Sequence, residues 1–159
     1  MILLSDSGST KTEWCLVNEN AGLFESCSTA GINPYYQDAQ TIFGILKKEF
    51  SLPLPEAVNV FFYGAGCGSE KAKAIVFSAL KEYFKTAPIV IESDLMAAAR
   101  SLCQRQAGIA CILGTGSNSC YYNGEVIVQH VPALGYILGD EGSGADLGRK
   151  LIADLLKKQ

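Results

Sequence analysis

Hydrophobic and polar residues alternate through the first thirty positions in a way that predicts three short strands. Strands are expected at residues 2–4, 13–18 and 23–30. Gly8 and the segment 18–22, which is rich in Asn and Gly, provide turn-forming residues between them. Three consecutive strands with short links are typical of an antiparallel meander.

The spacing of apolar residues then changes to that of helices alternating with strands. Helices are predicted at 39–50, 69–84 and 94–104, with strands at 57–64 and 87–93. The helix at 69–84 has Ser69 as its expected N-cap and an inward face made of Ala72, Ile75, Val76, Leu80 and Phe84. The first part of the chain is therefore predicted to be an α/β domain of order β-β-β-α-β-α-β-α.

The order of elements predicted for the start of the chain is repeated after residue 106. An apolar strand, a loop of Gly, Ser and Thr, a second strand, an Asn123-Gly124 hairpin signal and a third strand precede a helix at 145–158. That helix is expected to bury Leu147, Leu151, Ile152 and Leu155. We expect a first domain at 1–106 and, at 107–159, the opening β-β-β-α part of a duplicated second domain, truncated before its last two β-α units.

Composition limits the partners that the chain can have. The net charge is −3 with 13 Lys and Arg residues, which disfavours nucleic acid or an anionic membrane as a partner but leaves a small anionic ligand open. The six cysteines form no C-x-x-C pair and are expected to be buried thiols. No signal peptide or membrane span is evident, so a cytoplasmic protein is expected. Exposed apolar surface on an unfinished second domain would favour a homodimer or other self-association.

The polar segment between the first two strands can bind phosphate or be an ordinary turn. It lacks the second glycine and the following helix of a Walker A loop. A hairpin could still hold phosphate, because Gly8 has no Cβ and lets backbone N–H groups approach an anion. The hydroxyl groups of Ser9, Thr10 and Thr12 and the positive charge of Lys11 would add to this binding. Asp6, at the end of the first strand, could hold Mg²⁺ through water. A solvated polar turn is the alternative.

Two further places carry candidate chemistry. The loop Gly114, Thr115, Gly116 and Ser117 repeats the composition of the first loop, so the pair could clamp opposite sides of one polyphosphate. Asp94 stands where a strand meets a helix, a common position for a catalytic residue in α/β folds. Asp94 could equally be a helix N-cap, a role for which Ser93 competes.

Six motifs in order resemble the N-acetylglucosamine kinase branch, grouped with BadF/BadG-type ATPases, of the sugar kinase, actin and heat-shock-chaperone ATPase superfamily. They lie at residues 6–14 (DSGSTKTEW), 31–35 (GINPY), 64–68 (GAGCG), 92–99 (ESDLMAAA), 114–119 (GTGSNS) and 135–144 (GYILGDEGSG). The resemblance implies two ribonuclease H-like (actin-like ATPase) domains with the active site between them.

The resemblance also implies roles for individual residues in an ATP-dependent kinase of N-acetyl-D-glucosamine or a related amino sugar. Asp94 matches the catalytic base, Asp6 the acid near Mg²⁺, and residues 8–12 and 114–117 the two phosphate loops. Asn33, Asn118 and Asp140 match sugar-binding positions. The family's adenosine-binding segment lies later than residue 159, so we expect this chain alone to bind ATP weakly and to turn over little.

Two other functions stay open at this point. One is an ATPase activator of a reductive 2-hydroxyacyl-CoA dehydratase type of system, which would use cysteines to hold an iron–sulfur cluster; the sugar-type stretches speak against it. The other is a sugar or nucleotide sensor without catalysis, which would need neither Asp6 nor Asp94.

Overall fold

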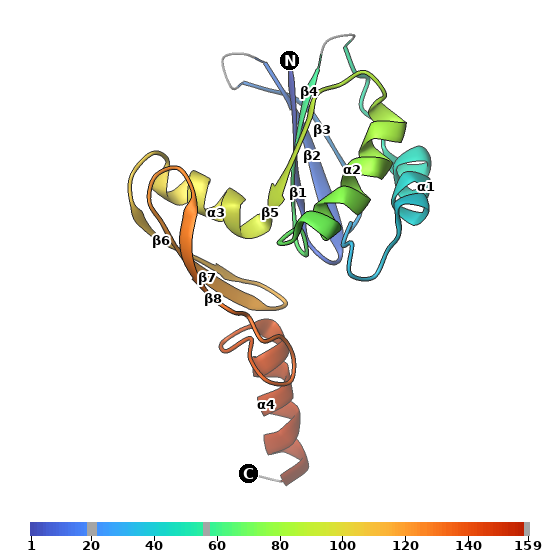
Figure 1. The fold of residues 1–159 in the computed structure, drawn as a ribbon. Coiled ribbons are helices and arrows are strands. Elements are labelled where there is room, and N and C mark those ends of the chain that lie inside the picture. The colour runs from blue at the N-terminus through green and yellow to red at the C-terminus, as the bar shows by residue number, and fades with distance from the viewer. Residues whose placement is uncertain (19–21, 56–57, 158–159) are drawn as a thin grey trace. The chain divides into compact units, whose positions relative to one another are not determined.

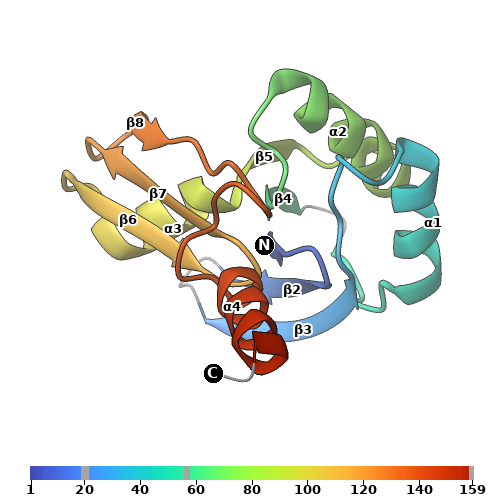
Figure 2. The same cartoon turned by 90° about the horizontal axis from the view of Figure 1, so that it is seen from below.

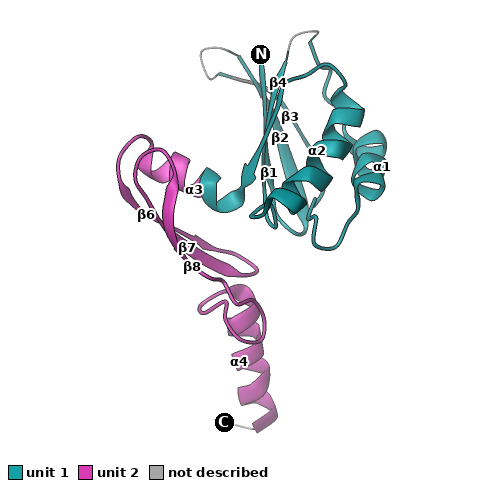
Figure 3. Cartoon of the chain, in the orientation of Figure 1, with its two compact units in different colours: residues 1–97 teal, residues 98–159 magenta. Residues whose placement is uncertain are grey.

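Two units make up the chain, Met1–Ala97 and Ala98–Gln159 (Figure 3). The computed structural model describes residues 1–18, 22–55 and 58–157. The middle of the predicted turn at 18–22, the first residue of the predicted strand at 57–64 and the end of the predicted helix at 145–158 lie outside these residues. The predicted domain boundary after residue 106 stays a prediction.

The first unit contains the predicted order of strands and helices (Figure 1). Its elements are β1 (Ile2–Ser7), β2 (Lys11–Val17), β3 (Leu23–Ala30), α1 (Ala39–Glu49), β4 (Asn59–Gly64), α2 (Glu70–Phe84), β5 (Ile89–Ser93) and the start of α3 (Asp94–Cys103). The five strands form one sheet in the order β3-β2-β1-β4-β5. The β1–β2 and β2–β3 pairs are antiparallel, whereas β4 pairs in parallel with both β1 and β5.

Helices α1 and α2 pack side by side over one face of this sheet (Figures 1 and 2). Asp38 caps α1 by accepting the Thr41 N–H at 2.8 Å, and Ser69 caps α2, as predicted, by accepting the Ala72 N–H at 3.3 Å. The predicted inward face of α2 is confirmed, since Ala72, Val76, Leu80 and Phe84 are buried and Ile75 packs against the core.

Trp14 on β2 is the centre of the core between the sheet and these helices. Its side chain is fully buried, and its ring centroid lies 5.4 Å from that of Phe50, 5.9 Å from that of Phe62 and 6.0 Å from that of Phe84. The indole N–H donates a hydrogen bond to Thr29 Oγ1 at 3.1 Å, so the one polar atom of the ring is satisfied. This packing fixes the strand that follows the first candidate loop.

The second unit repeats the meander that opens the first. Strands β6 (Gly108–Leu113), β7 (Ser117–Tyr122) and β8 (Ile127–Val131) pair antiparallel in that order, and α4 (Gly144–Lys157) follows. The register shifts near the end of the second strand in both copies, at Leu16/Val17 and at Tyr121/Tyr122. The predicted duplication and the hairpin at Asn123-Gly124 are therefore confirmed; Asn123 Oδ1 accepts the Val126 N–H at 2.9 Å.

Two expectations about burial are wrong. On α4, Leu147, Leu151, Ile152 and Leu155 are 59%, 70%, 59% and 74% exposed, because no described residue covers that face. Cys111 is exposed rather than buried, since it lies on β6, whose Ile109 and Leu113 are also exposed. Of the six cysteines, only Cys67 and Cys120 are buried. Within the described residues, none of the helices has the length and apolar character that a membrane crossing requires.

The hairpin between β1 and β2 is tied to the segment that follows β3. The buried Ser7 Oγ lies 2.7 Å from the buried Thr12 Oγ1 and accepts the Ile32 N–H at 3.0 Å. Thr12 Oγ1 also donates to the Ala30 carbonyl oxygen at 3.2 Å. Two hydroxyl groups therefore connect the base of the hairpin to the start of the 31–35 segment.

Gly31 lies directly against the hairpin backbone. Its N–H donates to the Thr10 carbonyl oxygen at 3.0 Å. A Cβ at this position would be 2.5 Å from the Gly8 carbonyl oxygen and 2.5 Å from the Ser9 carbonyl carbon. Since these are backbone atoms, they could not rotate away from an added methyl group.

We expect Gly31→Ala to lower the free energy of unfolding by at least ~1–3 kcal/mol, because the new methyl group must push two backbone segments apart. Gly44→Ala is the matched control: Gly44 is an exposed position of α1 with no heavy atom within 4 Å of an added Cβ. That control should stabilise the protein by roughly 0.5–1 kcal/mol through helix propensity. Urea unfolding followed by circular dichroism measures both; equal stability of the two variants would contradict the close approach.

Candidate functional site

Three chain segments that follow parallel strands meet at one edge of the first unit's sheet. In register, Ser7 of β1 lies opposite Gly64 of β4, which lies opposite Ser93 of β5. The hairpin after β1, the turn after β4 and the first residue of α3 therefore leave the sheet at the same edge (Figure 1). The carboxyl ends of parallel strands are the usual binding edge of such sheets.

Asp94 is the first residue of α3 at this edge, and Ser93 caps the helix. Ser93 Oγ accepts the Met96 N–H at 3.2 Å, which is the bond expected of an N-cap side chain. Asp94 Oδ1 accepts the N–H of the adjacent Leu95 at 2.8 Å. The alternative in which Asp94 serves as the helix cap is therefore not needed to explain the start of α3.

The pKa of the Asp94 carboxyl is raised above its ordinary value. Burial is the main cause, because it disfavours the charged form. The Leu95 N–H opposes the shift, while the negative charge of Asp6 adds to it. A raised pKa makes a carboxylate a better proton acceptor, as a general base requires.

Asp6, the exposed neighbour of Ser7, brings a second carboxylate to the same edge. Its neighbour Ser7 lies opposite Gly64, which lies opposite the Ser93 that precedes Asp94, so both carboxylates stand at this edge. Carboxylate oxygens suit Mg²⁺, which keeps several waters and binds proteins through one or two carboxylates together with phosphates. Among the described residues, no three or more His, Cys, Asp or Glu side chains are grouped so that they could hold a metal ion.

The first hairpin presents its backbone and part of its side chains to solvent. Gly8, Ser9, Thr10 and Lys11 are exposed, and Lys11 Nζ forms an ion pair with Glu13 Oε2 at 2.6 Å. Thr12, predicted with them as a phosphate ligand, is fully buried with its hydroxyl bonded to the protein. Thr12 thus supports the hairpin from inside, while the other four residues are exposed.

Asn33 lies against the turn after β4. It is buried, its Oδ1 accepts the Tyr35 N–H at 3.0 Å, and a Cβ added at Gly66 would be 2.5 Å from that oxygen. In the same turn Cys67 is fully enclosed, and burial, followed by the charge of Asp94, raises the pKa of its thiol to about 11. The structure therefore brings Asn33, this turn and Asp94 together at one edge of the sheet.

The second loop and its predicted neighbours lie in the second unit. Ser117 N–H donates to Asp140 Oδ1 at 3.1 Å, and Asn118 Oδ1 accepts the Ser119 N–H at 2.9 Å. A hollow of about 320 Å³ beside the loop is lined by Ser117, Asn118 and Glu141 among others. This unit therefore groups its predicted residues around one loop.

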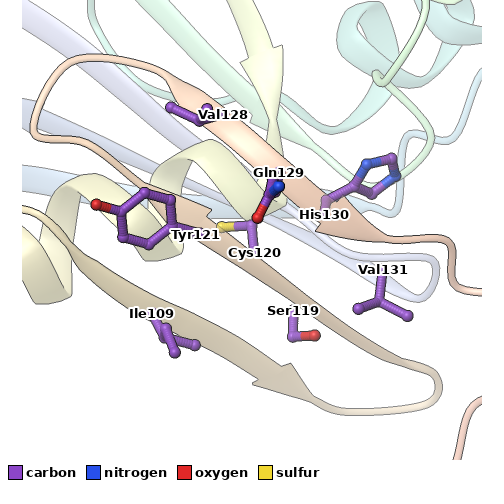
Figure 4. Close-up of a pocket in the computed structure, with 8 residues that line it drawn as sticks. All are labelled: Ile109, Ser119, Cys120, Tyr121, Val128, Gln129, His130 and Val131. Atoms are coloured by element: carbon purple, nitrogen blue, oxygen red, sulfur yellow. The ribbon is translucent and has the colours of Figure 1, made fainter.

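A larger hollow, of about 640 Å³, lies on β6, β7 and β8 (Figure 4). Ile109, Tyr121, Val128 and Val131 contribute its apolar lining, and none of the predicted site residues faces it. We therefore place the candidate chemistry at the two loops rather than at this surface.

Sequence reasoning missed Asp146, which organises the turn before α4. Its carboxylate accepts the Gly142 N–H at 3.0 Å and pairs with Arg149 and Lys150, while its own N–H donates to Ser143 Oγ. The Lys150 hydrogen bond, with Gly142 and Arg149 contributing in the same direction, lowers the pKa of Asp146 to about 2. The S-x-x-D spacing of a capping box was the available signal.

Comparison with known proteins supports the resemblance. A solved structure from Porphyromonas gingivalis, provisionally named an N-acetylglucosamine kinase, has a TM-score of 0.91 and 45% identity over 100% of this chain and 57% of its own. One from Chromobacterium violaceum, with the same provisional name, has a TM-score of 0.69 and 22% identity over 94% of this chain and 54% of its own, which shows the fold alone.

A curated relative agrees with these structures. The N-acetylmuramic acid/N-acetylglucosamine kinase of Clostridium acetobutylicum is 32% identical over 104 residues, which are 65% of this chain and 34% of the relative. No family model matches the chain. The chain spans about half the length of the solved relatives and a third of the curated one. The ribonuclease H-like fold and the likeness to N-acetylglucosamine kinases are thus confirmed.

Asp94→Asn should stabilise the protein at neutral pH. The pKa of this carboxyl is higher in the folded state than in the unfolded state, where it is about 4. Its contribution to stability is therefore complete below the unfolded-state pKa and is lost as the pH rises through the folded-state pKa. The gain in unfolding free energy over the wild type should therefore be present at pH 7 and vanish towards pH 3. Urea unfolding across this range measures it.

Asp38→Asn is the control with the opposite sign. Hydrogen bonds from Thr41 lower the pKa of Asp38, so its charged form favours folding above pH 4 and that contribution is lost on acidification. The unfolding free energy of Asp38→Asn, relative to that of the wild type, should therefore be lower at pH 7 than at pH 3. A difference in stability between Asp94→Asn and the wild type that is the same at both pH values would contradict the raised pKa of Asp94.

Proposed function

We propose that this chain, which resembles N-acetylglucosamine kinases in sequence and fold, carries the catalytic base and both phosphate loops of an ATP-dependent amino-sugar kinase. The observation that carries the proposal is the placement of Asp6 and Asp94 at the carboxyl edge of parallel strands, beside an exposed Gly-Ser-Thr hairpin. Phosphoryl transfer asks a protein mainly to position its reactants and to stabilise charge, and these groups suit that task.

Asp94 would accept the proton of the attacking sugar hydroxyl. Its raised pKa favours proton acceptance. Because Ser93 caps α3, the Asp94 carboxylate is not needed as the cap. Asn33 would contact the sugar, because it lies against the turn after β4 at the same edge. N-acetyl-D-glucosamine is the amino sugar we propose, on the names of the P. gingivalis and C. acetobutylicum relatives.

The phosphates of ATP would be held by the two loops. Residues 9–11 would contribute backbone N–H groups, two hydroxyls and one positive charge, while Gly8, whose own N–H donates to the Lys11 carbonyl oxygen, leaves room for the anion. Asp6 would bind the accompanying Mg²⁺. Residues 114–117 would hold the opposite side of the polyphosphate, with Asn118 and Asp140 reaching the sugar. Mg²⁺, when bound, would neutralise part of the charge that develops on the phosphoryl oxygens.

The dehydratase-activator alternative is not favoured. The 45% sequence identity to a protein provisionally named an N-acetylglucosamine kinase points away from it. A sensor without catalysis is disfavoured by the half-buried Asp94, since a binding protein gains nothing from a carboxylate whose charge opposes folding.

The test joins residues 1–159 to the remaining part of the P. gingivalis relative, so that every residue discussed comes from this chain. ADP release should depend on N-acetyl-D-glucosamine. Asp94→Asn should lower kcat at least about 10²-fold, the usual contribution of a general base, while sugar binding by calorimetry stays unchanged.

Asp38→Asn, an aspartate of the same unit that only caps α1, serves as the control and should keep its turnover. Undiminished kcat in Asp94→Asn would remove the proposed base. Absence of sugar-dependent ADP release from the unmutated fusion would remove the kinase assignment.

A further inference from the structure

The carboxylate of Asp140 lies on the backbone of the second loop. Ser117 N–H donates to Asp140 Oδ1 at 3.1 Å. A Cβ added at Gly116 would be 3.0 Å from one carboxylate oxygen and 3.1 Å from the other. The carboxylate therefore lies where the Cβ of any other residue at position 116 would be, and it accepts the N–H of the next residue in the loop.

This is the position that an anionic ligand of the loop would need. Carboxylate and phosphate oxygens both accept backbone N–H groups in charge-assisted hydrogen bonds, and a glycine lets either anion approach the chain closely. A phosphate at Ser117 would compete with Asp140 for one donor, and two negative groups at that distance repel each other.

The backbone around Asp140 is held independently of its carboxylate. The Asp140 carbonyl oxygen accepts the Ser143 N–H at 3.0 Å. The Gly144 N–H donates to the Gly114 carbonyl oxygen at 2.9 Å, and the Ala145 N–H donates to the Thr115 carbonyl oxygen at 3.2 Å. The carboxylate can thus rotate off the loop while the turn and the start of α4 stay docked on it.

We propose that Asp140 is an intramolecular occupant of the second phosphate loop, which it holds until a polyphosphate displaces it. This inference rests on the proposed function, because it takes the loop at 114–117 as a phosphate site. A sugar hydroxyl that engaged the Asp140 carboxylate would free the Ser117 N–H, so sugar and polyphosphate would favour each other's binding.

The test titrates inorganic tripolyphosphate into the 159-residue chain and follows the Ser117 amide by ¹⁵N nuclear magnetic resonance, with calorimetry for affinity. Asp140→Asn keeps the size of the side chain and removes its charge. We expect about tenfold tighter binding than in the wild type, together with a shifted Ser117 amide resonance before any ligand is added.

Asp154→Asn is the matched control, because it makes the same change of side chain at an exposed position of α4. It should leave both the affinity and the Ser117 resonance close to those of the wild type. An equal gain in Asp154→Asn would attribute the effect to net charge and overturn the inference.

Two further results separate this inference from the proposed function. If tripolyphosphate moves the Ser117 resonance with equal affinity in the wild type and Asp140→Asn, the loop is a phosphate site and Asp140 does not occupy it. If tripolyphosphate leaves the Ser117 resonance unmoved in both proteins, the second loop is not a phosphate site, and this part of the proposed function fails together with the inference.

Discussion

A hydrogen bond between two enclosed hydroxyl groups, those of Ser7 and Thr12, is the constraint on which the candidate site depends. It closes the base of the first hairpin, and its further bonds to Ile32 and Ala30 attach the segment that leads to Asn33. Losing either hydroxyl would remove this bond and also the bond to Ile32 or to Ala30, and a buried polar group left without its partner costs more than the bond itself contributes. The hairpin, Asn33 and the turn after β4 are therefore held as one piece.

Asp94 shows how structure and chemistry compete at this edge of the sheet. Burial and the nearby charge of Asp6 both oppose its ionisation, so the folded protein holds a carboxylate in surroundings that disfavour its charge. Ser93 supplies the cap that α3 requires, which leaves the aspartate available for a ligand. Local rules of sequence and structure are commonly broken at functional sites, so this environment agrees with the role proposed for Asp94.

The sequence predicted the order of elements because each depends on local signals. Period-two strands, capped helices such as that at Ser69, and the Asn123-Gly124 turn are all readable within a few residues. Thr12 could have been placed inside, since it lies two residues from the buried Trp14 on one strand. The contact of Asp140 with Ser117 joins residues 23 positions apart, and the exposure of α4 depends on what covers it, so neither could be predicted from periodicity.

Trp14 is the only tryptophan of the chain, and it lies in the aromatic cluster of the first unit. Its fluorescence therefore reports the local environment of that unit, and the second unit contributes tyrosine emission alone. Selective excitation of the indole would follow the unfolding of the first meander and its two helices without a spectroscopic contribution from the second meander. The two halves of this duplicated architecture thus carry different intrinsic chromophores, which lets their cooperativity be examined without any label.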